Sequence, residues 1–163
     1  MILITSAAYV EREFQIEYGA LPPTLLPIGN LRLFELQVDT LKTQFPAEKI
    51  YITLPLGYEL NTHDQSKLKS LDVYVIYQDE GISLGCSIYK TISDVVLAEK
   101  NLIICHGDTL VAKFSGKMDT LGIGICKDEH QWQLDDGSKS DDHVWCGYFS
   151  FSNLGLFLEC LIS

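Results

Sequence analysis

The strongest constraint on the fold of this chain is a regular alternation between short apolar segments and stretches with helical periodicity. The apolar segments have the length of single strands and cover residues 1–5, 49–54, 73–77 and 101–105. Alternation of strands with helices is typical of a parallel sheet covered by helices on both faces. The sequence therefore predicts an α/β domain.

Three helices are expected between these strands. Asn30 is expected to cap the first, whose apolar stripe follows helical spacing at Phe34, Val38, Leu41 and Phe45. Residues 64–71 predict the second helix, and residues 84–95 predict the third. Segment 6–30 precedes them and carries three prolines and two glycines. A connection of this length inside a compact domain is usually functional or disordered.

The pattern changes after residue 108. Strand-like segments follow at residues 120–126, 131–134 and 143–151, and polar turn residues separate the last two. We expect them to add antiparallel strands to the parallel sheet. A last helix is expected over residues 153–162, with apolar side chains at helical spacing.

Charge and cysteine usage exclude several classes of protein. The chain has 22 acidic and 12 basic residues, a formal net charge of −10, which argues against a nucleic-acid or anionic-membrane surface. No apolar run approaches the roughly 18–20 residues that a membrane-spanning helix needs, so no membrane insertion is expected. The five cysteines are widely spaced and form no C-x-x-C pair, which favours a reduced, cytoplasmic protein.

The segment Cys105-His106-Gly107-Asp108 closes the fourth apolar strand with a glycine and a carboxylate. Open α/β sheets bind ligands at the carboxyl ends of their strands. A carboxylate oxygen there suits Mg²⁺ that carries phosphate groups. The alternative is an Asp that only caps a turn, because Gly-Asp turns are common. Small residues at the first strand–loop junction, Ser6, Ala7 and Ala8, would either admit a ligand or pack tightly under the next strand.

Three blocks of the chain carry a family resemblance. Leu25–Gln37 resembles a segment "LLPIGNKPLIEYQ", Tyr77–Cys86 resembles a Gln-containing loop that runs into "LGTA", and Ile104–Leu110 resembles "xNGDxL". In this order and spacing they are similar to the sugar-phosphate nucleotidylyltransferases. A weaker match, Val144–Phe151, is similar to the "aGiYxF" strand of that family, so the resemblance extends to about residue 152.

The resemblance implies a nucleotide-diphospho-sugar transferase-like fold (GT-A or Rossmann-like), with a mixed, mostly parallel sheet and helices on both faces. It implies transfer of a nucleoside monophosphate from a nucleoside triphosphate to a sugar-1-phosphate or similar phosphorylated alcohol. Such products serve bacterial surface-polysaccharide and capsule synthesis. The implied cofactor is Mg²⁺ or Mn²⁺, held by Asp108. The implied nucleotide-binding residues are Ser6, Ala7, Ala8, Gln78, Gly85 and Gly107. Taken alone, Gly85 would be a turn glycine and Gln78 a polar residue after a strand.

The chain departs from the family in its signature loop. G-G-x-G-T-R-L followed by P-K-P should occupy residues 7–24, and these glycines are absent. The family's arginine falls on Glu13 and its lysine on Pro23. Arg12 and Arg32 are the candidate catalytic cations in their place. The chain is then either a divergent enzyme with a rebuilt loop or a domain that has lost the transferase chemistry.

Two alternatives to the transferase therefore stay open. One is a nucleotide- or nucleotide-sugar-binding domain that regulates or docks a partner without turnover. The other is a glycosyltransferase of the same fold, which typically wants an Asp-x-Asp-like motif, whereas Gly107-Asp108-Thr109 supplies one carboxylate. We expect a single domain over residues 1–163, the N-terminal part of a longer protein. It would work with a homo-oligomeric partner or an additional domain of the same polypeptide.

Overall fold

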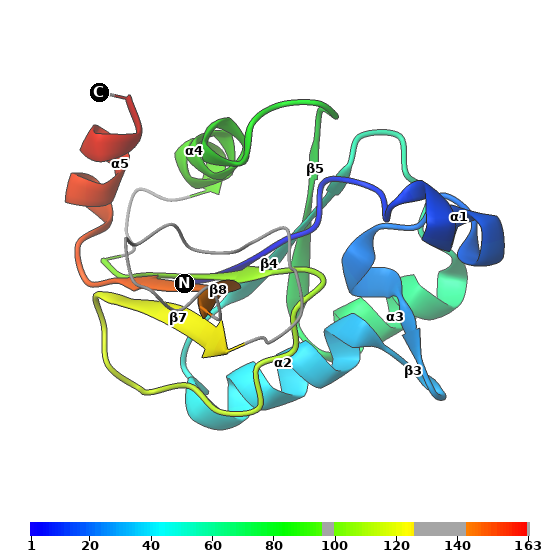
Figure 1. Cartoon of the computed structure of the whole chain (residues 1–163), viewed down its shortest axis with the longest axis horizontal. Coiled ribbons are helices and arrows are strands. Elements are labelled where there is room, and N and C mark those ends of the chain that lie inside the picture. The colour runs from blue at the N-terminus through cyan, green and yellow to red at the C-terminus, as the bar shows by residue number, and fades with distance from the viewer. Residues whose placement is uncertain (96–99, 126–142, 163) are drawn as a thin grey trace.

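The computed structural model describes residues 1–95, 100–125 and 143–162 (Figure 1). Six strands form one sheet in the order β5-β4-β1-β6-β8-β7. Four of them are parallel, namely β1 (Ile2–Thr5), β4 (Ile50–Pro55), β5 (Val73–Gln78) and β6 (Leu102–His106). The remaining two are antiparallel additions, β7 (Thr120–Ile125) and β8 (His143–Phe151). The mixed, mostly parallel sheet predicted from the sequence is confirmed.

Helices cover both faces of this sheet, as expected. α2 (Leu33–Gln44) and α3 (Thr62–Ser70) lie on one face, and α4 (Leu84–Val95) and α5 (Leu154–Ile162) lie on the other (Figure 1). Alternate residues of a strand point to opposite faces. Ile2 and Ile4 accordingly pack in one apolar cluster with α2, and Leu3 packs in a second cluster with α4. β1 is thus buried from both sides.

Segment 6–30 contains more regular structure than the sequence predicts. It holds the helix α1 (Arg12–Tyr18) and the 3-10 turn η1 (Pro23–Leu25). β2 (Pro27–Ile28) follows and pairs antiparallel with β3 (Leu31–Arg32) in a small hairpin. α1 buries none of its residues, so it lacks the apolar face by which a sequence pattern reveals a helix.

The predicted cap of the first long helix is wrong. Asn30 lies in the turn of the β2–β3 hairpin beside Gly29, whose φ of +62° suits that turn. The hairpin ends before α2 begins, so Arg32 is the N-cap residue. The carboxylate of Glu35 accepts a hydrogen bond from the Arg32 N–H at 2.9 Å. The helix therefore starts two residues later than an Asn30 cap would place it.

The other predicted boundaries are close to those observed. α3 begins at Thr62 behind a true Asn cap, Asn61, whose side chain accepts from the Asp64 N–H at 2.8 Å. α5 begins at Leu154, one residue after the predicted start. The strand expected at residues 131–134 lies outside the described residues. Across the described residues, no helix combines the length and apolar character needed to cross a membrane.

Candidate functional site

The candidate site lies where two neighbouring parallel strands end. β1 and β6 are paired with Thr5 opposite His106, so the residues that follow each strand leave the sheet side by side. They border a cavity of about 250 Å³. Its walls are Thr5, Ser6, Ala7, Ala8, Pro23, Ile82, Leu84, Ser87, His106, Gly107 and Asp108. Five predicted site residues are thereby brought together, namely Ser6, Ala7, Ala8, Gly107 and Asp108.

Gly107 allows the two strand ends to approach closely. Its N–H donates to the Thr5 carbonyl at 2.9 Å. A Cβ atom at this position would lie 2.7 Å from the Ser6 Cβ and 2.9 Å from the Thr5 carbonyl oxygen. Both distances are well inside van der Waals contact. The glycine is therefore needed for the packing of the site wall itself.

Buried hydroxyl groups hold the loop after β1 in place. The Ser6 N–H donates to the Thr53 hydroxyl at 2.9 Å, and the Ser6 hydroxyl accepts from the Thr24 N–H at 3.1 Å. The Thr24 hydroxyl in turn donates to the side-chain oxygen of Gln37 at 3.0 Å. All four residues are buried. The network ties β1 to β4, η1 and α2, and our sequence analysis did not identify it.

Asp108 has a carboxylate available to a cation. It is exposed at the cavity wall, and the Thr109 hydroxyl donates to one carboxylate oxygen at 3.0 Å. Among the described residues, no three His, Cys, Asp or Glu side chains gather into a metal-binding group. A single carboxylate fits Mg²⁺ or Mn²⁺, which take one or two protein carboxylates and complete their shell with phosphate oxygens and water.

His106 lies on the same wall as Asp108. Burial lowers the pKa of its imidazole, and the neighbouring Asp108 carboxylate partly opposes this shift. The ring is held from the other side by β8, because a Cβ on Gly147 would lie 2.7 Å from the His106 Cβ. The imidazole is therefore predominantly neutral at neutral pH.

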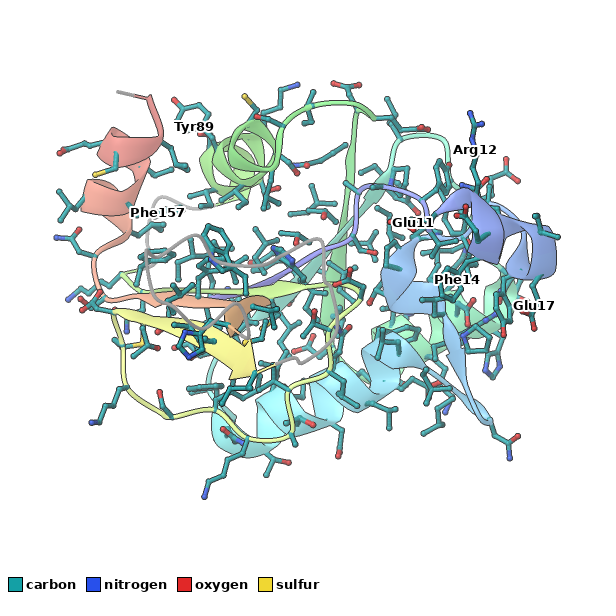
Figure 2. All side chains as sticks on the ribbon, viewed as in Figure 1. Glu11, Arg12, Phe14, Glu17, Tyr89 and Phe157 are labelled. Atoms are coloured by element: carbon teal, nitrogen blue, oxygen red, sulfur yellow. The ribbon has the colours of Figure 1, made fainter. Side chains whose placement is uncertain are left out.

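The two predicted cations do not line the cavity. The guanidinium of Arg32 bonds the buried Asp64 carboxylate at 3.2 Å and the Leu25 carbonyl at 3.1 Å. Arg32 therefore joins the β2–β3 hairpin to α3. Its guanidinium has a structural role there and is not directed into the cavity. Arg12 is the first residue of α1, and Figure 2 shows its side chain pointing outward from that helix. No Lys or Arg of the described residues borders the cavity.

Gln78 and Gly85, both predicted to contact the nucleotide, are absent from the walls of the cavity. The Gln78 side chain is buried and its amide donates to the Ser87 carbonyl at 2.8 Å and to the Thr91 hydroxyl. The Ser87 hydroxyl donates to its oxygen. With both ends of the amide engaged by α4, Gln78 does not face the cavity, whereas Ser87 does. Gly85 lies in the first turn of α4, where a Cβ would meet the Leu161 side chain at 3.7 Å.

Comparison with known proteins supports the fold. No family model and no curated protein sequence matches the chain. The nucleoside-diphosphate-sugar pyrophosphorylase of Vibrio cholerae RC9 superposes with a TM-score of 0.68 at 18% identity, covering 98% of this chain and 76% of that one. The inositol-1-phosphate CTP transferase of T. maritima superposes with a TM-score of 0.67 at 11% identity, covering 93% of this chain and 69% of that one. HddC of Yersinia pseudotuberculosis superposes with a TM-score of 0.64 at 14% identity, covering 93% of this chain and 76% of that one.

These sequence identities are low, so the comparisons establish the fold and no more than the fold. The resemblance drawn from the sequence motifs is confirmed at that level, because the structural neighbours include a nucleoside-diphosphate-sugar pyrophosphorylase and an inositol-1-phosphate CTP transferase. Fold alone does not assign a reaction, since one fold supports many functions.

Proposed function

We propose that this chain is a nucleotidyltransferase that moves a nucleoside monophosphate from a nucleoside triphosphate to a phosphorylated sugar or similar phosphorylated alcohol. The observation that carries the proposal is the cavity at the joined ends of β1 and β6, where Ser6, Ala7 and Ala8 face Gly107 and Asp108. Ligands of open α/β sheets bind at this edge. The neighbours named for sugar pyrophosphorylase and inositol-1-phosphate transferase activities support the substrate class.

The proposed reaction needs positioning and charge stabilisation from the protein. An oxygen of the acceptor phosphate attacks the α-phosphorus, and the bond to the pyrophosphate leaving group breaks, so no covalent enzyme intermediate is required. Asp108 would hold Mg²⁺ or Mn²⁺, and the ion would neutralise charge on the phosphate oxygens. Ala7 and Ala8 have short side chains, which let phosphate oxygens approach the backbone. Gly107 keeps the Asp108 loop against the loop after β1.

The biological setting belongs to the same proposal. An activated sugar or alcohol of this kind supplies bacterial surface polysaccharide, such as capsule. The acidic net charge of −10 is compatible with a small-molecule substrate escorted by a divalent cation.

A second function is favoured by one specific observation. Triphosphate chemistry uses Arg or Lys donors, and none of the described residues on the cavity wall supplies one. A domain that binds a nucleotide or nucleotide-sugar without turnover would not need these donors. Such a domain would act on a protein partner through its ligand-bound state.

Two measurements separate these functions. Pyrophosphate release is assayed with Mg²⁺, each common nucleoside triphosphate and a panel of sugar phosphates and phosphorylated alcohols. The transferase predicts release in at least one combination and its loss in Asp108→Ala. The binding domain predicts thermal stabilisation by a nucleotide or nucleotide-sugar with no pyrophosphate. Absence of both signals in every combination contradicts both functions.

A further inference from the structure

Gln37 is a buried amide that holds the loop carrying Asp108. It lies on α2 with 3% of its surface exposed. Its side-chain nitrogen lies within hydrogen-bonding distance of three backbone carbonyls, those of His106 at 3.0 Å, Gly107 at 3.3 Å and Thr109 at 2.8 Å. These three carbonyls flank Asp108 in the sequence. The backbone therefore wraps around one amide group just where the proposed metal ligand is attached.

The orientation of this amide is fixed by its partners. The Thr24 hydroxyl donates to the Gln37 side-chain oxygen at 3.0 Å, and the nitrogen faces acceptors only. Reversing the amide would set its oxygen against three carbonyl oxygens, which have no proton to donate. A buried carbonyl without a donor costs about 1–3 kcal/mol, so the observed orientation is strongly preferred.

The same amide also links the two walls of the cavity. Its oxygen accepts from Thr24, and the Thr24 N–H donates to the hydroxyl of Ser6 in the loop after β1. Its nitrogen donates to the loop after β6. One side chain thus sets both the position of the Asp108 loop and its distance from the opposite wall.

We infer that Gln37 is a positioning residue that holds the Asp108 carboxylate where a divalent cation and a nucleotide phosphate can share it. This inference rests on the proposed function, because it needs a cation at Asp108. Gln37 is not among the residues that line the cavity. It acts through the backbone of residues 106–109. Groups that orient a metal ligand in this way typically contribute 10–100-fold to metal affinity.

Substitution of Gln37 tests the inference directly. Gln37→Glu keeps the shape of the side chain but sets an acceptor against three acceptors. Gln37→Met keeps its length and removes both donor and acceptor. The matched control is Gln44→Met, because Gln44 on the same helix bonds the N–H of Phe114 at 3.0 Å, farther along the same chain segment. All three variants lose a side-chain bond to the segment after β6, and only two of them act next to Asp108.

The readout is Mn²⁺ binding in the presence of a nucleoside triphosphate, followed by the electron paramagnetic resonance signal of free Mn²⁺. We expect Gln37→Glu and Gln37→Met to weaken Mn²⁺ binding about 10–100-fold. Gln44→Met should stay within about twofold of the wild type, although it loses stability. Wild-type affinity in a folded Gln37→Glu or Gln37→Met protein would overturn the inference and leave the proposed function intact. No binding to the wild-type protein would overturn both.

A measurement on the wild-type protein covers variants that fail to fold. The side-chain NH₂ of Gln37 should give two slowly exchanging NMR signals, because it is buried and bonded to carbonyls. Mn²⁺ added with nucleotide should broaden these signals, since the amide is bonded to both residues that flank Asp108. Rapid exchange, or sharp signals when Mn²⁺ is bound, would contradict the inference.

Discussion

Gly107 lies where the two strand ends of the site approach closely. Gly107→Ala would place a Cβ 2.7 Å from the Ser6 Cβ and 2.9 Å from a backbone oxygen. Because backbone cannot rotate away, we expect a loss of about 1–3 kcal/mol in the free energy of unfolding. Urea denaturation measures this loss. Gly85→Ala is the control, since its Cβ would make an ordinary 3.7 Å contact in a helix and should leave stability equal or slightly higher. Equal losses in both variants would contradict the packing argument.

Cys105 is a structural thiol on β6. Burial raises the pKa of this thiol to about 12, and nearby Cys146 adds to the shift. Since the thiolate is the reactive form, we expect the folded protein to leave Cys105 unlabelled by iodoacetamide at pH 8. Cys86 is exposed and serves as the reactive control. Mass spectrometry of peptides locates the label. Labelling of Cys105 at the rate of Cys86 would show that this strand is not packed as described.

At the residue scale, the sequence predicts the chemistry of the site better than its support. Asp108 and the small residues after β1 could be found because strand ends in this fold share an edge. Gln37, Thr24 and Thr53 were missed, since their bonds join positions far apart in the chain. One signal was available. Gln37 lies one turn from Phe34 and Leu41 on the apolar stripe of α2, where a polar residue requires a partner.

The β2–β3 hairpin is attached to α3 by an ion pair that the sequence did not reveal. The Asp64 carboxylate is 1% exposed and accepts from Arg32 at 3.2 Å and from Asn61 at 2.7 Å. Asp64→Ala would leave the Arg32 guanidinium without its carboxylate partner. We therefore expect the free energy of unfolding, measured by urea denaturation, to fall by about 2–4 kcal/mol. Lys67→Ala is the matched control. Lys67 pairs with Glu35, also at 3.2 Å, and its side chain is largely exposed. Loss of this pair should lower the free energy of unfolding by about 0–1 kcal/mol. Comparable losses would remove the structural role assigned to this pair.

α1 lies in the segment after β1 and is attached mainly through the residues that flank it. The Val10 N–H donates to the Leu21 carbonyl at 2.9 Å, so the residues before and after α1 are bonded to each other. The helix itself buries no residue. We expect α1 amides to exchange with deuterium much faster than those of α2, because local opening is cheap where few apolar contacts break. Peptide-level exchange measures the difference. Equal protection in α1 and α2 would mean that α1 packs more firmly than its exposure indicates.

At the element scale, the sequence predicts the four helices that pack on the sheet and misses α1, which buries no residue. α2, α4 and α5 were placed within a few residues, since each carries apolar side chains at helical spacing. α3 was also placed within a few residues, although Leu68 is its single apolar residue. α1 has no such stripe, and the hairpin before α2 displaced the expected Asn30 cap. Gln78 shows a related limit. It was expected just after the strand and is the last residue of β5, and the direction of its side chain depends on packing against α4.

At the scale of the whole molecule, the alternation of strands and helices determines the layers of the fold but not which strands lie side by side in the sheet. A parallel sheet with two helical layers follows from right-handed strand–helix–strand units. Placing β1 between β4 and β6 does not follow from spacing, and it is this order that creates the site. The family resemblance predicted a mixed, mostly parallel sheet and gave no strand order, which comes from the structure. The described fold agrees with neighbours at TM-scores of 0.64–0.68.

The central claim is that the edge formed by β1 and β6 binds a nucleoside triphosphate through a cation at Asp108. Crystals soaked with Mn²⁺ and a nucleoside triphosphate, measured for the anomalous signal of manganese, test it most directly. We predict a manganese peak at about 2.0–2.2 Å from an Asp108 carboxylate oxygen, a distance usual for hard divalent cations. The phosphates should lie between Ala7 and Gly107. Manganese and nucleotide bound elsewhere, for example in the cavity lined by Arg32 and His63, would contradict the claim.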